Sequence, residues 1–360
     1  MAVVPSIPLE NPMEHAKPPF ANRAERARAR AQACEQFLAT FAPGPNQDLL
    51  AEMMVTLTRL SADECGRGEV KILNRALKEL RYAFKVFAPY ENVPKVSIFG
   101  SARTPPDHPQ YLQAVKFSRL IRQAGWMNIT GAGNGIMRAG NEGAKREASF
   151  GVAISLPFEQ SHNDIIADDE KLITFNYFFT RKLLFVKEAD AIILFPGGFG
   201  TQDEGFEALT LIQTGKSEPI PVVMCDEPGG TYWRHWRDYV EAELLGNGTI
   251  SPDDLGLFYV TDSAEDAVNE ILSFYKRFHS TRFVHDRLVM RLKSPVADSS
   301  LAEFNRDFAD IVEKDEIRQV LEALPEEDGE HAKLPRLVFH FTRRSLGRLR
   351  ALIDAVNKAE

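Results

Sequence analysis

The architecture of the chain is set by VSIFGSARTPPDHPQYLQAVKFSRLIRQAGWMNITGAGNGIMRAGNEGAKREASFGVAISL (residues 96–156). Short β-branched or apolar runs alternate here with longer helical patterns: strands are expected at 96–100, 127–130 and 152–156, and helices near 109–124 and 135–148. Strands that alternate with helices are typical of a parallel sheet covered on both faces. The segment therefore predicts the start of a doubly wound α/β sheet.

The same alternation continues to about residue 280. The expected strands are KLITF (171–175), AIILF (191–195), PVVMC (221–225) and LFYVT (257–261), and the expected helices lie near 177–188, 201–214, 230–245 and 263–277. We therefore expect residues 91–280 to form a Rossmann-like domain. In such a domain, ligands bind outside the carboxyl ends of the strands.

The two flanking regions have different patterns. Residues 1–90 are expected to form an N-terminal extension: an extended or disordered Pro-rich start (1–20), then helices at 23–41, 48–61 and 69–87. Residues 281–360 are expected to form a small α+β appendage: strands at 287–292 and 336–341, helices at 299–323 and 344–358, and a loop at 325–333. The sequence thus predicts three regions, 1–90, 91–280 and 281–360.

Composition excludes several classes of protein. The chain has 360 residues, 44% hydrophobic and 26% charged, which is the range of a globular protein. Its formal charge is −8, so it lacks the basic surface of a general nucleic-acid binder. No apolar run approaches the roughly 20 residues of a membrane span, and the three cysteines form no CxxC pair. We expect a cytoplasmic protein without a nucleic-acid or membrane partner.

Three glycine-bearing turns follow expected strands. They are Gly100-Ser101-Ala102, then Gly131-Ala132-Gly133-Asn134-Gly135, then Pro196-Gly197-Gly198-Phe199-Gly200-Thr201. Glycine lets the backbone approach a ligand closely, and the helix that follows each turn presents free N–H groups and a positive dipole end. One such turn alone is more often a tight connection. Three at one sheet edge favour an anionic ligand, most simply a nucleotide. The turns match neither the usual dinucleotide fingerprint nor a P-loop.

Charged residues lie close to the third turn. Asp203 and Glu204 fall in the first turns of the helix after it, where acidic side chains also serve as ordinary helix starts. Arg181 and Lys182 lie on the preceding helix, where a solvated face or a salt bridge is the alternative interpretation. The eight histidines show no metal-ligand spacing, so we expect neither a metal nor another cofactor.

These residues resemble a known signature. The run FFTRKLLFVKEADAIILFPGGFGTQDEGFEALTLIQTGK (178–216) is similar to that of the Lonely Guy (LOG) family, the nucleoside 5′-monophosphate phosphoribohydrolases long misnamed lysine decarboxylases. The family pattern PGGxGTxxE is matched by Pro196, Gly197, Gly198, Gly200, Thr201 and Glu204, and its upstream Arg-Lys pair by Arg181-Lys182. The turn at 131–135 and Gly100-Ser101 resemble the glycine-rich loop and first-strand turn of the family. The resemblance covers about residues 95–275.

The resemblance implies hydrolysis of the N-glycosidic bond of a nucleoside 5′-monophosphate to a free base and ribose 5-phosphate. Glu204 would stabilise the oxocarbenium-like transition state, orient water or hold ribose hydroxyls, and Arg181 would stabilise the departing base or anchor the nucleotide. Substrate contacts would come from Gly100, Ser101, Gly131, Gly133, Asn134, Gly135, Lys182, Gly197, Gly198, Gly200 and Thr201. Tyr177, Phe178 or Phe179 could stack on the base, and a homodimer or a higher multiple of dimers is implied.

Departures from the short plant-type pattern bear on the substrate. Phe179 and Thr180 stand where those members often have His and Glu, and the flanking regions resemble the longer bacterial branch. This favours a purine nucleotide such as AMP over a cytokinin riboside monophosphate.

Other functions remain open at this stage. The main alternative is a non-catalytic nucleotide- or molybdenum-cofactor-binding protein of the same fold, because fold alone does not fix function. True lysine decarboxylation would need pyridoxal phosphate and a lysine to bind it as a Schiff base, and Lys182 is the one residue that supports this alternative. The tail arginines Arg343, Arg344, Arg348 and Arg350 are interpreted as a solvated helix face, with a regulatory anion site as the alternative.

Overall fold

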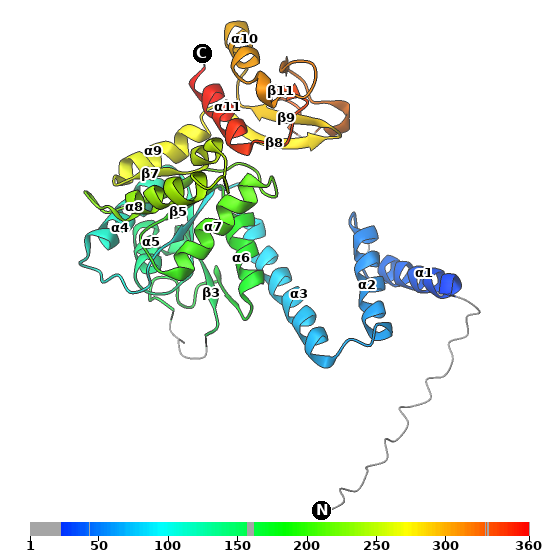
Figure 1. Ribbon diagram of the computed structural model, residues 1–360. Helices are drawn as coiled ribbons and strands as arrows, with labels where there is room; N and C mark the ends of the chain where they lie inside the picture. Colours follow the sequence, from blue (N-terminus) through cyan, green and yellow to red (C-terminus); the bar gives the residue numbers. More distant parts are fainter. Residues whose placement is uncertain (1–22, 43, 157–161, 328, 330, 360) are drawn as a thin grey trace, which may run out of the picture. The chain divides into compact units, whose positions relative to one another are not determined.

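The computed structural model describes residues 23–42, 44–156, 162–327, 329 and 331–359 (Figure 1). The expected extended start at 1–20 lies outside the described residues. Among the described helices, none combines the length and the apolar character that a bilayer crossing requires.

A seven-stranded parallel sheet forms the centre of the chain, in the order β4-β3-β2-β1-β5-β6-β7. The strands are β1 (Lys95–Phe99), β2 (Met127–Thr130), β3 (Ser149–Ile154), β4 (Leu172–Phe175), β5 (Ala191–Leu194), β6 (Val222–Cys225) and β7 (Tyr259–Thr261). β1 lies in the middle, with Val96 opposite Asn128 of β2 and Ala191 of β5. The strand order reverses beside β1, which is where a ligand crevice is expected in such sheets.

Helices cover both faces of this sheet (Figure 1). The first layer contains α4 (Pro109–Gln123), α5 (Ile136–Ala144) and α9 (Ala264–Phe274), and the second contains α3 (Arg67–Phe87), α6 (Phe178–Lys187), α7 (Phe199–Gln213) and α8 (Tyr232–Tyr239). Successive strand residues point to opposite layers: Ile193 packs with the first and Leu194 with the second. This explains why the strands are apolar throughout, and the predicted Rossmann-like fold is confirmed.

The N-terminal helices are α1 (Arg23–Phe41), α2 (Gln47–Ala62) and α3, followed by a 3-10 turn at Ala88–Tyr90. The chain divides into two compact units between Arg75 and Ala76, within α3. The second half of α3 belongs to the central unit, because Phe87 stacks on Phe150 with ring centres 4.3 Å apart and Thr180 Oγ1 donates to Glu79 over 2.8 Å. The division into three regions at residues 90 and 280 stays a prediction.

The C-terminal region contains a four-stranded antiparallel sheet in the order β10-β11-β9-β8. Its elements are β8 (Phe278–Val284), β9 (Arg287–Leu292), α10 (Asp298–Asp307), β10 (Arg318–Val320), β11 (Arg336–Phe339) and α11 (Leu346–Lys358). The predicted helix at 299–323 is wrong beyond residue 307. Asn305 Oδ1, in the last turn of α10, accepts a hydrogen bond from the Ile317 N–H over 2.7 Å. The chain then continues as β10, which pairs with β11. Strand β8 was not predicted.

A buried ion cluster holds Glu327, near the start of the predicted loop at 325–333. Glu327 lies in a 3-10 turn (Pro325–Glu327) and has no exposed side-chain surface. Its carboxylate accepts from Arg291 Nη2 at 2.8 Å and from Arg336 Nε at 2.7 Å. Burial acts to raise the pKa of Glu327, but the hydrogen bonds from Arg336, the Leu324 N–H and Arg291 outweigh it and hold the pKa below its usual range. The turn is therefore anchored to β9 and β11.

Glu327→Ala should destabilise the chain by about 3–5 kcal/mol, because it leaves two buried guanidinium groups without their carboxylate. The neighbouring variant Glu326→Ala is the matched control. Glu326 forms a partly exposed pair with Arg287 at 3.3 Å, and its loss should cost less than about 1 kcal/mol. Urea unfolding followed by far-UV circular dichroism measures both. Equal effects of the two substitutions would contradict the prediction.

Candidate functional site

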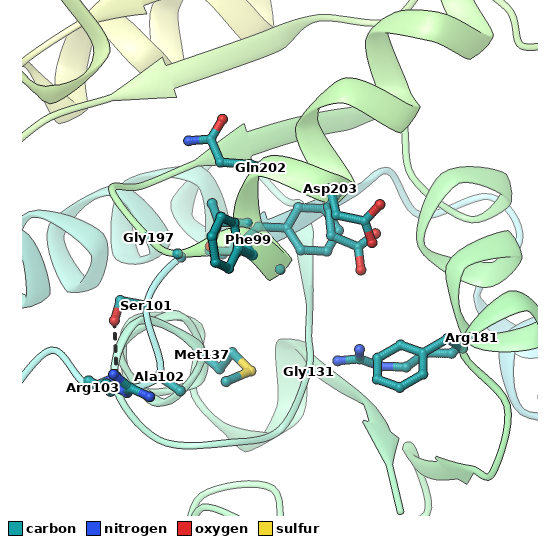
Figure 2. A pocket seen from close by; sticks show the side chains of 18 of the residues that line it. Phe99, Ser101, Ala102, Arg103, Gly131, Met137, Arg181, Gly197, Gln202 and Asp203 are labelled. Atoms are coloured by element: carbon teal, nitrogen blue, oxygen red, sulfur yellow. Dashed lines mark hydrogen bonds between the residues drawn. The ribbon is translucent and has the colours of Figure 1, made fainter. Parts of the chain in front are cut away.

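The turns after β1, β2 and β5 surround one cavity of about 820 Å³ (Figure 2). Nine predicted site residues line it: Gly100, Ser101, Gly131, Arg181, Gly197, Gly198, Gly200, Thr201 and Glu204. The remaining lining residues are Ile98, Phe99, Ala102, Arg103, Met137, Phe178, Phe199, Gln202, Asp203 and Tyr232. The cavity lies at the carboxyl edge of the sheet, beside the point where the strand order reverses.

The first two turns fit together only because Gly135 has no side chain. Its φ is +60°, and a Cβ there would lie 2.2 Å from the carbonyl oxygen of Ser101. The Ile136 N–H donates to that same carbonyl over 3.0 Å. The turn after β1 is thus held directly against the start of α5. The glycine at position 135 therefore has a steric explanation that does not involve a ligand.

The third turn is joined to the first in a similar way. The Ser101 N–H donates to the Pro196 carbonyl over 3.2 Å. A Cβ on Gly197 would lie 2.1 Å from Thr201 Oγ1 and 3.0 Å from Ser101 N. Tyr232 supports the turn from α8, since its hydroxyl donates to the Gly197 carbonyl over 2.6 Å and accepts from Gln202 Nε2 over 2.6 Å.

The N-terminus of α7 opens into the cavity. The Gln202 N–H makes the first backbone bond of the helix, to the Gly198 carbonyl at 3.1 Å. The N–H groups of Phe199, Gly200 and Thr201 precede it and have no carbonyl one turn back to accept them. No side chain caps this end. Together with the helix dipole, these groups favour an anion.

Glu204 is the buried acid of the cavity. It lies on α7 just after the helix start, and 9% of its surface is exposed. Burial raises the pKa of Glu204 to about 7; Arg181 and Lys182 oppose that rise, while Glu207 and Asp203 add to it. A carboxyl group with this pKa changes its charge near neutral pH, which is a property common among catalytic carboxyl groups.

Arg181 reaches the cavity from α6. Its Nε donates to the Val152 carbonyl over 2.8 Å, and its guanidinium carbon lies 5.0 Å from the centre of the Phe185 ring. The guanidinium points toward Gly131 in Figure 2, and a Cβ on Gly131 would lie 2.5 Å from Arg181 Nη2. Burial lowers the pKa of Arg181, and Glu204 counteracts this. A fixed cation and a titratable carboxyl group therefore share one cavity.

Four predicted site residues lie outside the lining. Lys182 follows Arg181 in sequence but points to another side of α6, where it pairs with Asp203 at 2.9 Å and Glu207 at 2.8 Å. Gly133, Asn134 and Gly135 belong to the second turn, of which only Gly131 lines the cavity. The Gly133 carbonyl is turned toward Asn163, whose Nδ2 donates to it over 3.0 Å.

Several lining residues were not found from the sequence. Arg103 and Gln202 adjoin recognised turns, so their proximity along the chain was a usable signal. Tyr232 lies about 30 residues after its turn, and no sequence pattern connects them. Of the three aromatic residues considered for stacking, only Phe178 lines the cavity, while Tyr177 and Phe179 stack on each other with ring centres 5.5 Å apart.

Three tail arginines are engaged within the protein. Arg348 pairs with Asp310 at 2.8 Å, Arg350 bonds to Glu270 and Asp354, and Arg343 lies over the Phe283 ring. The regulatory anion site considered for this cluster therefore gains no support from the structure. Across the described ranges, no group of three or more His, Cys, Asp or Glu side chains is arranged to hold a metal ion.

Comparison with known proteins finds matches to the central part of the chain. Residues 132–271 match the family model described as "Possible lysine decarboxylase". Two cytokinin riboside 5′-monophosphate phosphoribohydrolases, from Mycobacterium tuberculosis and Mycobacterium marinum, are 28% and 27% identical to this chain over 168 residues, covering 45% of it and 86% of each relative. The molybdenum cofactor binding protein of Rippkaea orientalis is 22% identical with a TM-score of 0.37, over 50% of this chain and 96% of that one.

The class of protein defined here is a Rossmann-like α/β protein with a cavity at the carboxyl edge of its parallel sheet. More narrowly, its PGGFGTQDE motif and the family match at 132–271 make the central part of the chain similar to the Lonely Guy family.

The burial of Glu204 should make stability depend on pH. The folded state holds the Glu204 proton up to about pH 7, whereas the unfolded chain releases it near 4.5, so stability falls as the pH rises through this window. Glu204→Gln should therefore raise the free energy of unfolding by roughly 1–3 kcal/mol near pH 8, and the gain should shrink toward pH 5.

Urea unfolding at both pH values measures this effect. Glu207→Gln, one turn further along α7 and paired with Lys182, is the control and should show no gain near pH 8. An equal gain from Glu204→Gln at both pH values would contradict the raised pKa.

Proposed function

We propose that this protein hydrolyses the N-glycosidic bond of a purine nucleoside 5′-monophosphate, AMP or a related nucleotide, to the free base and ribose 5-phosphate. The observation that carries the proposal is the buried Glu204, with its pKa near 7, in one cavity with Arg181 and the open N-terminus of α7. The family match at 132–271 and the activity named for the two mycobacterial relatives support the same reaction class.

The 5′-phosphate is assigned to the start of α7. The N–H groups at Phe199, Gly200 and Thr201 and the Thr201 hydroxyl are the donors available there. A Cβ on Gly198 or Gly200 would meet no atom within 4 Å, so these two positions leave room for a ligand close to the backbone. A phosphate at this place gains from both the free N–H groups and the helix dipole.

The ionised Glu204 is assigned to the sugar. As the C1′–N bond breaks, its electron pair goes to the base nitrogen and positive charge develops on the ribose ring. A carboxylate at the anomeric carbon stabilises that charge and orients the attacking water, whose hydroxide adds to C1′ while a proton passes to the base. Glu204 has the burial that strengthens such an interaction.

Arg181 is assigned to the departing base. Its charge is retained at neutral pH even with a lowered pKa, so it acts as a hydrogen-bond donor and a positive charge and does not serve as the proton donor. Phe178 and Phe199, which are 54% and 96% exposed and both line the cavity, supply apolar surface for a purine ring.

A panel of nucleoside 5′-monophosphates tests the reaction. AMP, GMP, IMP, CMP, UMP and a cytokinin riboside monophosphate are incubated with the protein, and free base is measured by chromatography. We expect release of adenine or another purine, and no release from adenosine, which lacks the phosphate. Tight binding of a monophosphate without any base release would favour a nucleotide-binding protein instead and overturn the hydrolase proposal.

Glu204→Gln should lower kcat by at least about 100-fold, because the neutral amide does not stabilise the developing positive charge. Glu207→Gln makes the same chemical change outside the cavity lining and should retain kcat within about threefold. In the unsubstituted protein, kcat/KM should rise with pH through about 7, since the carboxylate is the active form. Full turnover by Glu204→Gln would remove Glu204 from the mechanism.

A further inference from the structure

The turn at Gly131–Gly135 contains a strained residue that is not glycine. Ala132 has a φ of +61° and is fully buried. An alanine in this left-handed conformation costs on the order of 1 kcal/mol and persists only where its surroundings determine it. The contacts that hold Ala132 therefore determine the shape of the whole turn.

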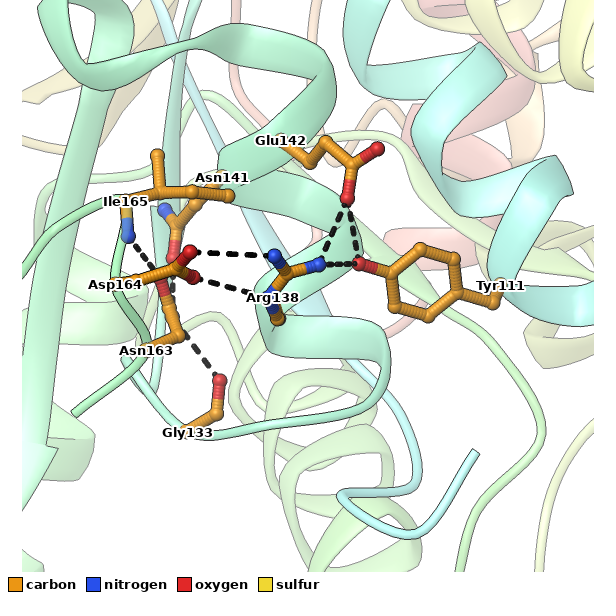
Figure 3. A network of polar contacts seen from close by, with 8 residues as sticks. All are labelled: Tyr111, Gly133, Arg138, Asn141, Glu142, Asn163, Asp164 and Ile165. Carbon is orange, nitrogen blue, oxygen red and sulfur yellow. Dashed lines mark hydrogen bonds and ion pairs between the residues drawn. The ribbon is translucent and has the colours of Figure 1, made fainter. Parts of the chain in front are cut away.

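Asn163 binds two backbone carbonyls of this turn from a segment that follows β3 (Figure 3). Its backbone N–H donates to the Ala132 carbonyl over 2.9 Å. Its Nδ2 donates to the Gly133 carbonyl over 3.0 Å and to Asn141 Oδ1 over 2.9 Å. Asn163 is 3% exposed and does not line the cavity, so it holds the turn from behind.

Thr130 and Asn141 complete the support from the other side. The Ala132 N–H donates to Thr130 Oγ1 over 3.1 Å, and that hydroxyl donates to Asn141 Oδ1 over 2.9 Å. Asn141 Oδ1 thus joins Thr130 to Asn163, and both the N–H and the carbonyl of Ala132 are bonded. The turn has one well-determined position as long as this network is intact.

The position of the turn matters for Arg181. The Arg181 guanidinium lies against Gly131, where even a Cβ would be 2.5 Å from Nη2. On the guanidinium, Nε is held separately by Val152 of β3. A shift of the turn toward or away from the cavity therefore moves the surface on which the Nη2 end of Arg181 rests.

We propose that Asn163 is a positioning residue for the hydrolysis, acting through the Gly131–Gly133 backbone on the placement of Arg181. This inference rests on the proposed function. It assigns Asn163 no contact with substrate, and it makes the amide donor at Nδ2 the essential feature of the side chain.

The neighbouring Asp164 provides a matched control. Asp164 Oδ1 accepts from Arg138 Nε at 3.0 Å, which fastens the same segment to α5, and the Asp164 side chain is 74% exposed. Arg138 also contacts Tyr111 and Glu142 (Figure 3). Asp164→Asn weakens the attachment of the segment without removing a bond to the Gly131–Gly135 turn.

The experiment compares Asn163→Ala, Asn163→Asp and Asp164→Asn in the full chain with AMP, or with the best monophosphate of the panel. Asn163→Asp keeps the size and the backbone bond but replaces the Nδ2 donor with an acceptor that faces two oxygens. We expect both Asn163 variants to lose about 10- to 100-fold in kcat/KM, whereas Asp164→Asn stays within about threefold. Assays are run well below the measured Tm of each variant.

The pH profile separates positioning from a general loss of stability. Glu204 is faced by Arg181 and Lys182 from α6 and by Asp203 and Glu207 from its own helix. Of these, only Arg181 rests on the Gly131 turn. Displacing it removes a positive charge that lowers the pKa of Glu204, so the acidic limb of kcat/KM should move to higher pH by at least about 0.5 in the Asn163 variants.

The outcomes are distinguishable. If the unsubstituted protein releases no base from any monophosphate, the proposed function fails, and this inference fails with it. If that protein is active but the Asn163 variants match Asp164→Asn, the function stands and the positioning role is overturned. A loss of kcat/KM with an unmoved acidic limb likewise overturns the route through Arg181.

Discussion

Two backbone hydrogen bonds of Ser101 join the three turns that line the cavity. Its carbonyl accepts the N–H of Ile136 at the start of α5, and its own N–H reaches the carbonyl of Pro196 ahead of α7. The first approach needs glycine at Gly135, where a Cβ would lie 2.2 Å from the Ser101 carbonyl oxygen, and at the second a Cβ on Gly197 would lie 3.0 Å from Ser101 N. These contacts hold the turns after β1, β2 and β5 together around one cavity. Each functional side chain is then placed by the helix that carries it.

The electrostatics of the cavity depend on the same packing. Burial of Glu204 raises its pKa to about 7, and the cations on α6 keep it from rising further. Burial likewise lowers the pKa of Arg181, which the carboxylate opposes. Each group thus lowers the cost of charging the other, and a ligand that excludes water strengthens the coupling. Under the proposed function, a phosphate at the start of α7 would add negative charge near Glu204 and raise the pKa of its carboxyl group further.

The features that could be predicted from the sequence are those whose residues lie close together along the chain. Each central strand and its glycine turn are formed by consecutive residues. The run AIILF followed by PGGFGTQDE therefore indicated both strand β5 and a turn that lines the cavity. Strand β8 was missed because its exposed and buried residues do not alternate regularly, and β10 because it is short and follows a helix-like segment. Tyr232 and Asn163 support turns about 30 residues away in sequence, and only the tertiary fold connects them to those turns.

Lys182 shows why adjacency in sequence did not predict a shared role. Consecutive residues of a helix are about 100° apart around its axis, so Arg181 facing the cavity requires Lys182 to face elsewhere. It faces α7, where it pairs with Asp203 and Glu207 and keeps only 16% of its side chain exposed. These two acids flank Glu204 on that helix. Lys182 therefore joins α6 to α7, the two helices that carry Arg181 and Glu204, without itself lining the cavity.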